Sequence, residues 1–398
     1  MRASLVLMLC LLVFNTAIDW YILRQIKHRC RKHTGLWMRL ELYSAVIITM
    51  MLVGAIIVPA DQGSNQWLLA KMWLLFGYLS VYVPKFLGVL FDLLASIPVL
   101  FGHRRIKALT VTGIIVGATS LAAMWWGALA GRMMIDRNNI DIYVTDLPEA
   151  FDGYRIVQFS DLHTGTFNTD TTFVSRLVDQ INATRPDAIF FTGDIVNRES
   201  SEITPFITTL QRLKANDGVY AILGNHDYGD YIEWPSAEAK QENMQKLVDA
   251  YRQAGARLLL NETAWLHRHN DSIAVIGVEN IGEPPFPVYG SLTRAYPHLG
   301  DNTTKILLTH NPMHWVDSIA DNNAVNVPLT LSGHTHAMQI KIAGMSPSAL
   351  RYPTWGGLYA DAHERHQLYV NIGCGTIGFP MRLGATPEIT VITLRRRR

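Results

Sequence analysis

The segment Ile156–His163, IVQFSDLH, decides the fold of this chain. Its first four residues are mainly apolar and favour extended backbone, so they are predicted to form a buried strand. Asp161 and His163 follow at the carboxyl end of that strand, where parallel α/β sheets place ligand-binding groups. Residues two apart in an extended segment point to the same side, so both side chains are expected to grip one metal ion.

Four further apolar runs end in polar clusters of the same kind: Ala188–Asn197, Val219–Asp227, Lys305–Asn311 and Leu329–His336. The clusters contain Asp194, Asn197, Asn225, His226, Asp227, His310, His334 and His336. Carboxylate, amide and imidazole groups without a thiolate suit Mn²⁺, Fe or Zn²⁺ better than Ca²⁺ or a structural zinc bound by cysteines. The five clusters together predict a shared metal site.

A single Asp or Asn after a strand is most often a turn former or a helix N-cap. Five such motifs in order, each at a strand end, favour a pair of metal ions instead. Two ions about 3.5–4 Å apart activate a water molecule and clamp a phosphoryl group, and a bridging carboxylate holds them against their repulsion. A glycine precedes Asp194, Asn225 and His334, which lets the backbone approach the site or turn sharply.

The ordered motifs DxH, GDxxN, GNHD, TH and GHTH resemble the calcineurin-like metallophosphoesterase superfamily over residues 140–394. Leu147-Pro148, Phe151–Gly153 and Pro387–Thr390 resemble its bacterial envelope branch. The resemblance implies a first metal ion held by Asp161, His163, Asp194 and His336. It implies a second ion, bridged through Asp194, held by Asp194, Asn225, His310 and His334. His226 would contact the substrate phosphate or protonate the leaving oxygen, and Asp227 would orient His226.

The composition divides the chain of 398 residues, which is long enough for two or three units. Hydrophobic residues make up 49% and charged residues only 17%, and residues 1–131 are mostly apolar. We predict a membrane region at 1–131, a linker at 132–139 and a phosphoesterase domain at 140–398. The three cysteines lie far apart and predict no disulfide framework, and the net charge of +2 shows no nucleic-acid footprint.

Four membrane spans are expected: Leu5–Leu23, Leu40–Val58, Trp67–Phe101 and Ala108–Leu129. The first is predicted to be a transmembrane helix rather than a signal peptide, because no small-x-small cleavage site precedes the basic run. The third is too long for one straight span and is expected to be one tilted, kinked helix. Within it Lys85 and Asp92 share a helix face; we expect them to face the bundle interior and to pair or snorkel, with a functional role as the alternative.

The basic loops 24–39 and 102–107 predict a cytoplasmic side, and the loop 59–66, without Lys or Arg, predicts the outer side. Four spans then place both termini outside. The chain is expected to be an integral protein of the cytoplasmic (inner) membrane whose catalytic domain is extracytoplasmic, or periplasmic in a cell with two membranes. This inference fails if Trp67–Phe101 forms two spans or none.

Alternating strands and helices in the remaining chain predict a layered α/β domain with two sheets face to face, flanked by helices. The expected helices are Phe167–Arg185, Phe206–Lys214 and Ala237–Ala254. Ile140–Val144 is expected to be an edge strand, and Gln367–Asn371 and Ile389–Leu394 are further strands. The strands expected in the second sheet are Ala256–Asn261, Trp265–Arg268 and Ile273–Val278.

Two loops near the predicted metal ligands bear on the substrate. Glu279–Leu299, rich in Pro and Gly, is expected to shape substrate access. Ile342–Tyr359 carries apolar and aromatic residues that suit a membrane interface or a lipid substrate, or pack on the domain; the sequence leaves both open.

The sequence therefore predicts a membrane-bound phosphoesterase with two divalent ions, Mn²⁺ first and Fe or Zn²⁺ as alternatives. Its expected bond is a phosphodiester or pyrophosphate of a lipid-linked or cell-envelope substrate. A general phosphomonoesterase, a nucleotide phosphodiesterase and a non-catalytic metal-binding sensor or scaffold are the alternatives. Expected partners are the phosphoester substrate and membrane lipid, with no nucleic acid and no predicted protein partner.

Overall fold

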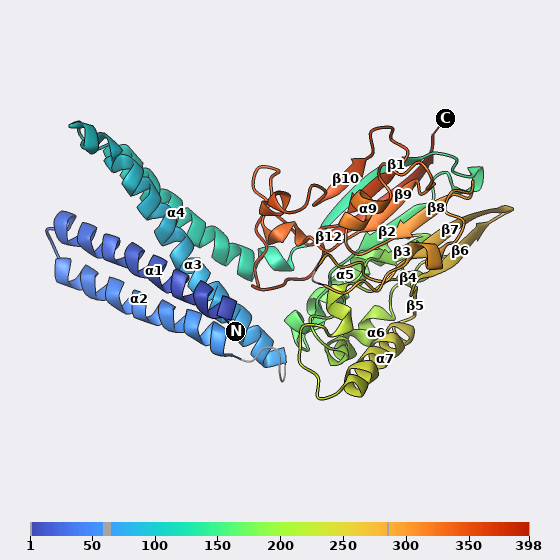
Figure 1. Cartoon of the computed structure of the whole chain (residues 1–398), viewed down its shortest axis with the longest axis horizontal. Coiled ribbons are helices and arrows are strands. Elements are labelled where there is room, and N and C mark those ends of the chain that lie inside the picture. Colours follow the sequence, from blue (N-terminus) through green and yellow to red (C-terminus); the bar gives the residue numbers. More distant parts are fainter. Residues whose placement is uncertain (1, 59–64, 285, 398) are drawn as a thin grey trace. The chain divides into compact units, whose positions relative to one another are not determined.

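The computed structural model describes residues 2–58, 65–284 and 286–397, which divide into a helical unit and a unit built on two sheets (Figure 1). The helical unit contains α1 (Arg2–Arg29), α2 (Thr34–Ile57), α3 (Asn65–Ser96) and α4 (Lys107–Leu129), with a 3-10 helix at Ile97–Phe101. Within these ranges four helices are long and apolar enough to cross a membrane, as expected. Most of the loop 59–66 lies outside the described residues.

Two details of the spans differ from or sharpen the prediction. The long third stretch forms one helix, with Pro84 inside it, so it is not divided into two spans. The basic run 24–39 is not a loop, because α1 continues to Arg29 and α2 begins at Thr34. Lys and Arg are good helix formers and are favoured in the last turn of a helix, so α1 extends through most of the run.

Lys85 and Asp92 bind separate partners inside the helical unit. The ammonium of Lys85 lies 3.0 Å from a carboxylate oxygen of Asp19 on α1 and 2.9 Å from one of Glu41 on α2. Asp92 accepts a hydrogen bond of 2.6 Å from Tyr21 and pairs with the guanidinium groups of Arg29, at 2.8 Å, and Arg105. Both residues therefore face inward and are paired, as expected from the cost of an unpaired charge at membrane depth.

The first sheet of the other unit has the order β1-β12-β2-β3-β4-β5. Its strands are β1 (Asp136–Val144), β2 (Arg155–Phe159), β3 (Ala188–Phe191), β4 (Val219–Ala221), β5 (Ala256–Leu258) and β12 (Glu388–Arg396). Strands β2 to β5 are parallel, while β12 runs antiparallel to β2 and parallel to β1. Strand β1 lies at the edge, as predicted, and starts at Asp136, four residues before the expected strand start at Ile140.

The second sheet has the order β10-β11-β9-β8-β7-β6. Its strands are β6 (Glu262–Arg268), β7 (Asp271–Gly277), β8 (Lys305–Leu308), β9 (Leu329–Ser332), β10 (Gly357–Ala360) and β11 (Gln367–Val370). The four central strands are parallel, and the edge strands β6 and β10 are antiparallel to their neighbours. The two mixed sheets flanked by helices confirm the predicted fold class.

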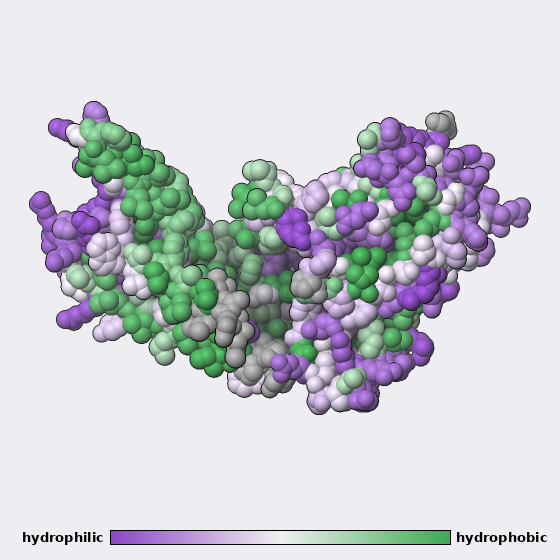
Figure 2. Space-filling model, viewed as in Figure 1, coloured by the Kyte–Doolittle hydropathy of each residue, from purple (hydrophilic) through white to green (hydrophobic). Residues whose placement is uncertain are grey.

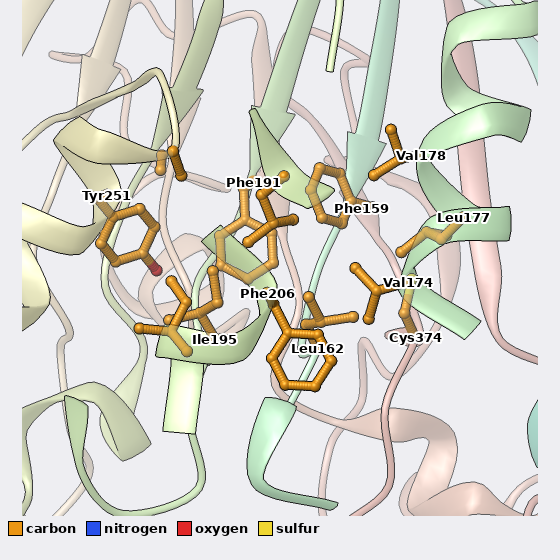
Figure 3. Close-up of a cluster of buried hydrophobic side chains, with 14 of the residues drawn as sticks. Phe159, Leu162, Val174, Leu177, Val178, Phe191, Ile195, Phe206, Tyr251 and Cys374 are labelled. Atoms are coloured by element: carbon orange, nitrogen blue, oxygen red, sulfur yellow. The ribbon is translucent and has the colours of Figure 1, made fainter. Parts of the chain in front are cut away.

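Three apolar cores hold these layers together. Side chains from both sheets, such as Ile156, Val275 and Leu331, form the core between the sheets. The outer face of the first sheet packs on helices, and Figure 3 shows Phe159 and Phe191 among these buried side chains. A third cluster covers the outer face of the second sheet. Strand β2 is thus buried on both faces, which explains why its sequence is a nearly continuous apolar run.

The helices of this unit are α5 (Thr172–Ala183), α6 (Ile207–Leu210), α7 (Ala237–Gln253), α8 (Leu292–Ala295) and α9 (Met313–Ser318). Helix α7 matches the prediction, with Ser236 as its N-cap. Helix α5 starts five residues later than predicted, because Asn168 has a left-handed backbone and the Asp170 carboxylate accepts from the amide of Thr172. The expected helix at 206–214 is shorter than predicted: only α6 (Ile207–Leu210) forms within it, and a 3-10 helix at Ser200–Phe206 precedes α6.

The segment Ala256–Asn261 was predicted in the wrong sheet. Its residues Ala256–Leu258 form β5, which pairs in parallel with β4 at the edge of the first sheet. Helix α7 connects β4 to β5, and such a strand–helix–strand crossover returns the chain to the same sheet. Strands β6 and β7 lie in the second sheet, as predicted.

Candidate metal centre

The carboxyl ends of five parallel strands from both sheets meet at one edge of the sandwich. The loop after each of these strands carries one of the polar clusters predicted from the sequence. The clusters are Asp161 and His163 after β2, Asp194 after β3, Asn225, His226 and Asp227 after β4, His310 after β8, and His334 and His336 after β9. The structure brings these nine side chains or their adjoining backbone into one network of contacts.

One group of buried donor atoms consists of Asp161, His163 and His336. Nε2 of His163 lies 3.1 Å from Nε2 of His336, which in turn lies 3.2 Å from Oδ1 of Asp161. Oδ2 of Asp194 is 3.6 Å from Nε2 of His163. These four side chains thus surround one point, and they are the set implied for the first ion.

A second group shares the same oxygen of Asp194. Nε2 of His310 lies 3.2 Å from Oδ2 of Asp194 and 3.3 Å from Nδ1 of His334. Oδ1 of Asn225 is 2.9 Å from that Nδ1 of His334. Asp161 and His310 also approach each other, with 4.0 Å between Oδ1 and Nε2. The Asp194 carboxylate therefore stands between the two groups, where a bridging ligand is needed.

The donor atoms fit divalent cations in spacing and in charge. Two ligand atoms that bind one ion at about 2.1 Å lie about 3.0–3.4 Å apart, close to the separations seen here. Burial lowers the pKa of His163 well below its usual range and that of His334 to about 3, so both imidazoles stay neutral. Burial opposes protonation of His310 as well, but the Asp194 carboxylate raises its pKa to about 10. The two carboxylates thus attract positive charge, and His163 and His334 offer neutral nitrogen lone pairs.

Contacts on the far side of two rings fix which nitrogen faces the centre. Nδ1 of His310 lies 2.7 Å from the carbonyl oxygen of Thr192 and donates a hydrogen bond to it. Nε2 is therefore the ring nitrogen that faces the centre as a metal ligand. Nε2 of His334 is 3.0 Å from the hydroxyl of Tyr352, which leaves Nδ1 toward the centre. Such outer contacts orient metal-binding imidazoles and increase their basicity.

The backbone around the centre differs from the extended geometry predicted for the Asp-x-His pair. Asp161 and His163 have φ of 51° and 47°, and Asp194, His334 and His336 are also left-handed. Side chains rarely adopt this conformation, and strain of this kind concentrates at functional sites. The two side chains therefore converge through a tight turn and not through the period of a strand.

The glycines before the ligands act through close approach, as predicted. Gly193 has a φ of 96°, and a Cβ there would lie 2.6 Å from the backbone nitrogen of Gly224. A Cβ at Gly224 would lie 2.2 Å from Oδ1 of Asp194. Neither position has room for a side chain, so the loops after β3 and β4 come together only with glycine at both.

His226 stands beside the centre on the wall of a pocket. Its Nδ1 lies 2.8 Å from the carbonyl oxygen of Asn197, and its ring stacks on Tyr231 at 4.3 Å between centroids. Its backbone amide donates to Asp194 over 2.8 Å. Within the described chain no hydrogen bond engages Nε2, so this atom is available to a molecule in the pocket.

The structure places Asp227 differently from the expected role of orienting the His226 ring. One carboxylate oxygen accepts from the amides of Asp194 and Gly224, at 2.9 and 2.8 Å. The other accepts from the amides of Ile195 and Val196, at 2.9 and 3.3 Å. Buried amides need such a partner, so Asp227 fixes the loop after β3. The contact that orients the ring comes from the Asn197 carbonyl in that loop.

The pocket next to the centre has a volume of 330 Å³ and includes residues that the sequence analysis did not single out as site residues. Tyr231, Phe286, Arg351 and Tyr352 contribute to its wall. Phe286 and Tyr352 belong to the two loops that were expected near the substrate. Tyr231 follows the GNHD motif by a few residues, and its hydroxyl accepts from the Asn225 amide over 2.7 Å. Its position, four residues after the last residue of the GNHD motif, is the feature of the sequence that could have identified Tyr231 as a site residue.

Arg382 gave no signal in the sequence. Its side chain is 1% exposed, and Nη2 lies 3.2 Å from Nδ1 of His336. The guanidinium also donates to the carbonyl oxygens of Ile372, Gly375 and Ala385. It thereby ties the loop after β11 to the back of the first donor group, over a separation of 46 residues.

Comparisons with known proteins agree with this architecture. Residues 154–338 match the family model described as calcineurin-like phosphoesterase, and residues 1–132 match one described as a probable calcineurin-like phosphoesterase transmembrane domain. The uncharacterized metallophosphoesterase YkuE of Bacillus subtilis (strain 168) is 33% identical over 267 residues, 66% of this chain and 86% of that protein. A transmembrane protein with metallophosphoesterase domain from Bos taurus is 30% identical over 261 residues, which is 64% of this chain and 56% of that protein. The protein of the same name from Danio rerio is 29% identical over 65% of this chain and 57% of its own length.

Proposed function

Because the chain belongs to the calcineurin-like phosphoesterase family, we propose that it hydrolyses a phosphodiester or pyrophosphate bond in a lipid-linked or cell-envelope substrate. It is a membrane-associated metallophosphoesterase, a metal-dependent hydrolase of phosphoric esters. The observation that carries the proposal is the pocket that opens directly beside two converging groups of metal-binding side chains.

The two ions are assigned to the two donor groups. Asp161, His163, Asp194 and His336 would hold the first, and Asp194, Asn225, His310 and His334 the second. When bound, two divalent ions lower the pKa of water and neutralise charge on the phosphoryl oxygens. Oxygen and nitrogen donors without a thiolate support Mn²⁺ as the native ion, with Fe or Zn²⁺ as alternatives.

His226 is proposed as the group that protonates the leaving oxygen or contacts the substrate phosphate. His226 lines the pocket, and the Asn197 carbonyl and the Tyr231 ring hold its imidazole in place. A general acid must lie within hydrogen-bond reach of the leaving group, which a wall position provides. Asp227 contributes indirectly, because it fixes the loop that supplies the Asn197 carbonyl.

The pocket favours a substrate with a substantial group beyond the phosphorus. Its aromatic walls and the Arg351 guanidinium leave room for a second substituent on the phosphorus, which a phosphodiester or pyrophosphate has and a phosphomonoester lacks. His226 also weighs against a metal-binding scaffold, since holding ions requires no proton donor on the pocket wall.

The predicted boundaries, 1–131, 132–139 and 140–398, remain our proposal for the domains. So does the location of the catalytic domain outside the cytoplasmic membrane. Basic residues flank both the turn between α1 and α2 and the segment before α4, and turns that follow alternate spans lie on the same side. The cytoplasmic excess of Lys and Arg then directs the domain outward.

Two measurements test the proposal. The purified full chain with Mn²⁺ should hydrolyse a bis-aryl phosphodiester, and chelation should abolish the activity; no hydrolysis would favour the scaffold. Reporters fused after Arg398, one active only outside and one only in the cytosol, should give an outside signal. A cytosolic signal would overturn the sidedness and bring nucleotide-linked substrates to the first place.

A further inference from the structure

Two loops at the mouth of the pocket expose large apolar side chains. Met345 and Leu350 are 72% and 93% exposed on the loop before β10, and Val288 is 62% exposed on the loop after β7. Ile342 and Phe286 are also exposed. We call these five residues the apolar rim; Figure 2 shows apolar residues gathered over the loop before β10. Side chains of this size stay in water only at a cost, so a cluster of them indicates an interaction surface.

The rim is held at the pocket by defined contacts. Arg351, next to Leu350, pairs with Glu283 of the other loop over 2.7 Å. Tyr352 bonds to His334, and both Tyr352 and Phe286 line the pocket. Isolated bridges pair Ile281 with Val288 and Ile342 with Met345 within the two loops. The exposed side chains therefore lie on the two loops that border the pocket beside the metal centre.

The chain from the membrane region enters this unit at the same edge. Strand β1 starts at Asp136, whose partner in the register is Glu388, the first residue of β12. The amide of Glu388 donates to the carbonyl of Gly373, and the amide of Gly375 donates to the carbonyl of Asp161. The start of β1 thus lies at the end of the sheet that carries the metal ligands.

The connection between the last membrane helix and this edge is short. Helix α4 ends at Leu129 and β1 begins at Asp136. Six intervening residues span at most about 25 Å even when fully extended. This length limits how far the start of β1 can lie from the end of α4.

We propose that the apolar rim inserts into the membrane interface and admits a phosphoester whose apolar tail stays in the bilayer. The lipid surface is favoured over other partners because the tether emerges at this edge and because exposed Lys341, beside Ile342, offers a cation to lipid phosphates. This inference rests on the proposed function, since it names the class of substrate that the metal centre receives.

The insertion can be measured without any turnover. The full chain, with Cys10 and Cys30 replaced by Ala, carries an environment-sensitive fluorophore at Met345→Cys or Leu350→Cys; Cys374 is buried and unreactive. Reconstitution uses vesicles of phosphatidylcholine and phosphatidylglycerol, with and without nitroxide-labelled lipid. The matched control is Asn270→Cys, in the exposed turn between β6 and β7 at the opposite end of the sandwich.

Labels at 345 and 350 should show blue-shifted emission that nitroxide lipid quenches, and the label at 270 should show neither. Emission like that of the control at both rim positions would overturn the proposal. A blue shift without quenching would also overturn it, because the rim would then be covered by protein, such as a second copy of the chain.

A kinetic comparison separates this inference from the proposed function. Leu350→Asp and Met345→Asp should each lower kcat/KM roughly tenfold on an aryl phosphodiester anchored in vesicles, the effect of losing burial of one large apolar side chain. Hydrolysis of a soluble aryl phosphodiester should stay unchanged. If the unsubstituted protein hydrolyses the soluble substrate but the variants keep full activity on vesicles, only the rim proposal fails.

Discussion

Two groups of buried carboxylates in this molecule have their negative charge neutralised in different ways. In the helical unit, Asp92 is surrounded by Arg29, Arg105 and Tyr21, so its charge is compensated by the chain itself. In the sheet unit, Asp161 and Asp194 are buried among imidazoles, of which His163 and His334 have a lowered pKa. The first cluster is complete without any addition.

The second cluster is complete only with cations from solution. Buried carboxylates need a partner of opposite charge, and imidazoles with free lone pairs supply ligands rather than charge. The comparison teaches that buried acids surrounded by several imidazoles mark a metal centre, whereas a buried acid paired directly with two guanidinium groups marks a structural joint.

The sharpest test of this contrast is Asp194→Asn. The change removes the negative charge of the carboxylate that both donor groups share, so activity on an aryl phosphodiester should fall by at least about 10³-fold. Metal analysis of the purified protein should show weakened binding of both ions. Retained metal-dependent activity would contradict the bridging role.

The matched control is Asp361→Asn. Asp361 pairs with His366 over 2.9 Å, and both side chains are nearly inaccessible; the pair lies in the turn between β10 and β11, and its other contacts are with backbone groups. Its loss should reduce stability without changing the metal content. Equal loss of metal in both variants would mean that any buried Asp–His pair affects the site through the fold.

The next effect concerns His226, which lines the pocket and is proposed to act as a proton donor rather than a metal ligand. His226→Gln should lower kcat by about 10²–10³-fold while both metals stay bound, because only proton transfer is removed. Parallel assays of activity and metal content distinguish a loss of proton transfer from a loss of bound metal. His366→Gln, a buried histidine outside the centre, should leave kcat near its original value, and loss of metal from the His226 variant would refute the assignment.

For the self-compensated cluster, Asp92→Asn should act on stability alone. Removing the carboxylate leaves two guanidinium groups without their counter-charge, which should cost about 2 kcal/mol of stability in detergent, since Arg29 is partly exposed. Thermal unfolding measures the loss, with the exposed Thr119→Ala as control. Folded protein should keep full activity on a soluble substrate, and a fall in metal content would break the distinction between the clusters.

The smallest expected effect tests the second donor group. Tyr231→Phe removes the hydroxyl that accepts from the Asn225 amide but keeps the ring against His226. One lost hydrogen bond should raise the Mn²⁺ concentration needed for half-maximal activity about threefold to tenfold. A lower kcat at saturating Mn²⁺, with an unchanged Mn²⁺ concentration for half-maximal activity, would contradict this role. The hydroxyl would then take part in the catalytic step.

The sequence predicted what depends on short-range pattern. Buried strands such as β2, which contains the sequence IVQF, are recognisable as apolar runs. Each candidate ligand motif between residues 161 and 336 directly follows such a strand, so these motifs could be found from the sequence. The sheet that Ala256–Leu258 joins could not be predicted from the sequence. A short strand with both polar and apolar residues has no pattern that favours one sheet over the other.

Contacts between segments that are distant in the chain could not be predicted from the sequence either. Asp227 follows His226 directly, which suggested a pair, yet its carboxylate turns to the amides of another loop. Arg382 reaches His336 only because the loop after β11 folds back over the centre. Such contacts depend on tertiary geometry that neighbouring residues do not encode.

The position of β12 has a consequence for how the protein is made. This strand, residues 388–396, lies between β1 and β2, although it follows them by more than two hundred residues in the chain. A ribosome has therefore released the membrane helices and every ligand motif before the strand that joins β1 to the sheet appears. Until then β2 presents an unpaired edge, so the nascent domain depends on protection during synthesis and transfer, and a stop codon shortly before residue 388 would leave an open sheet.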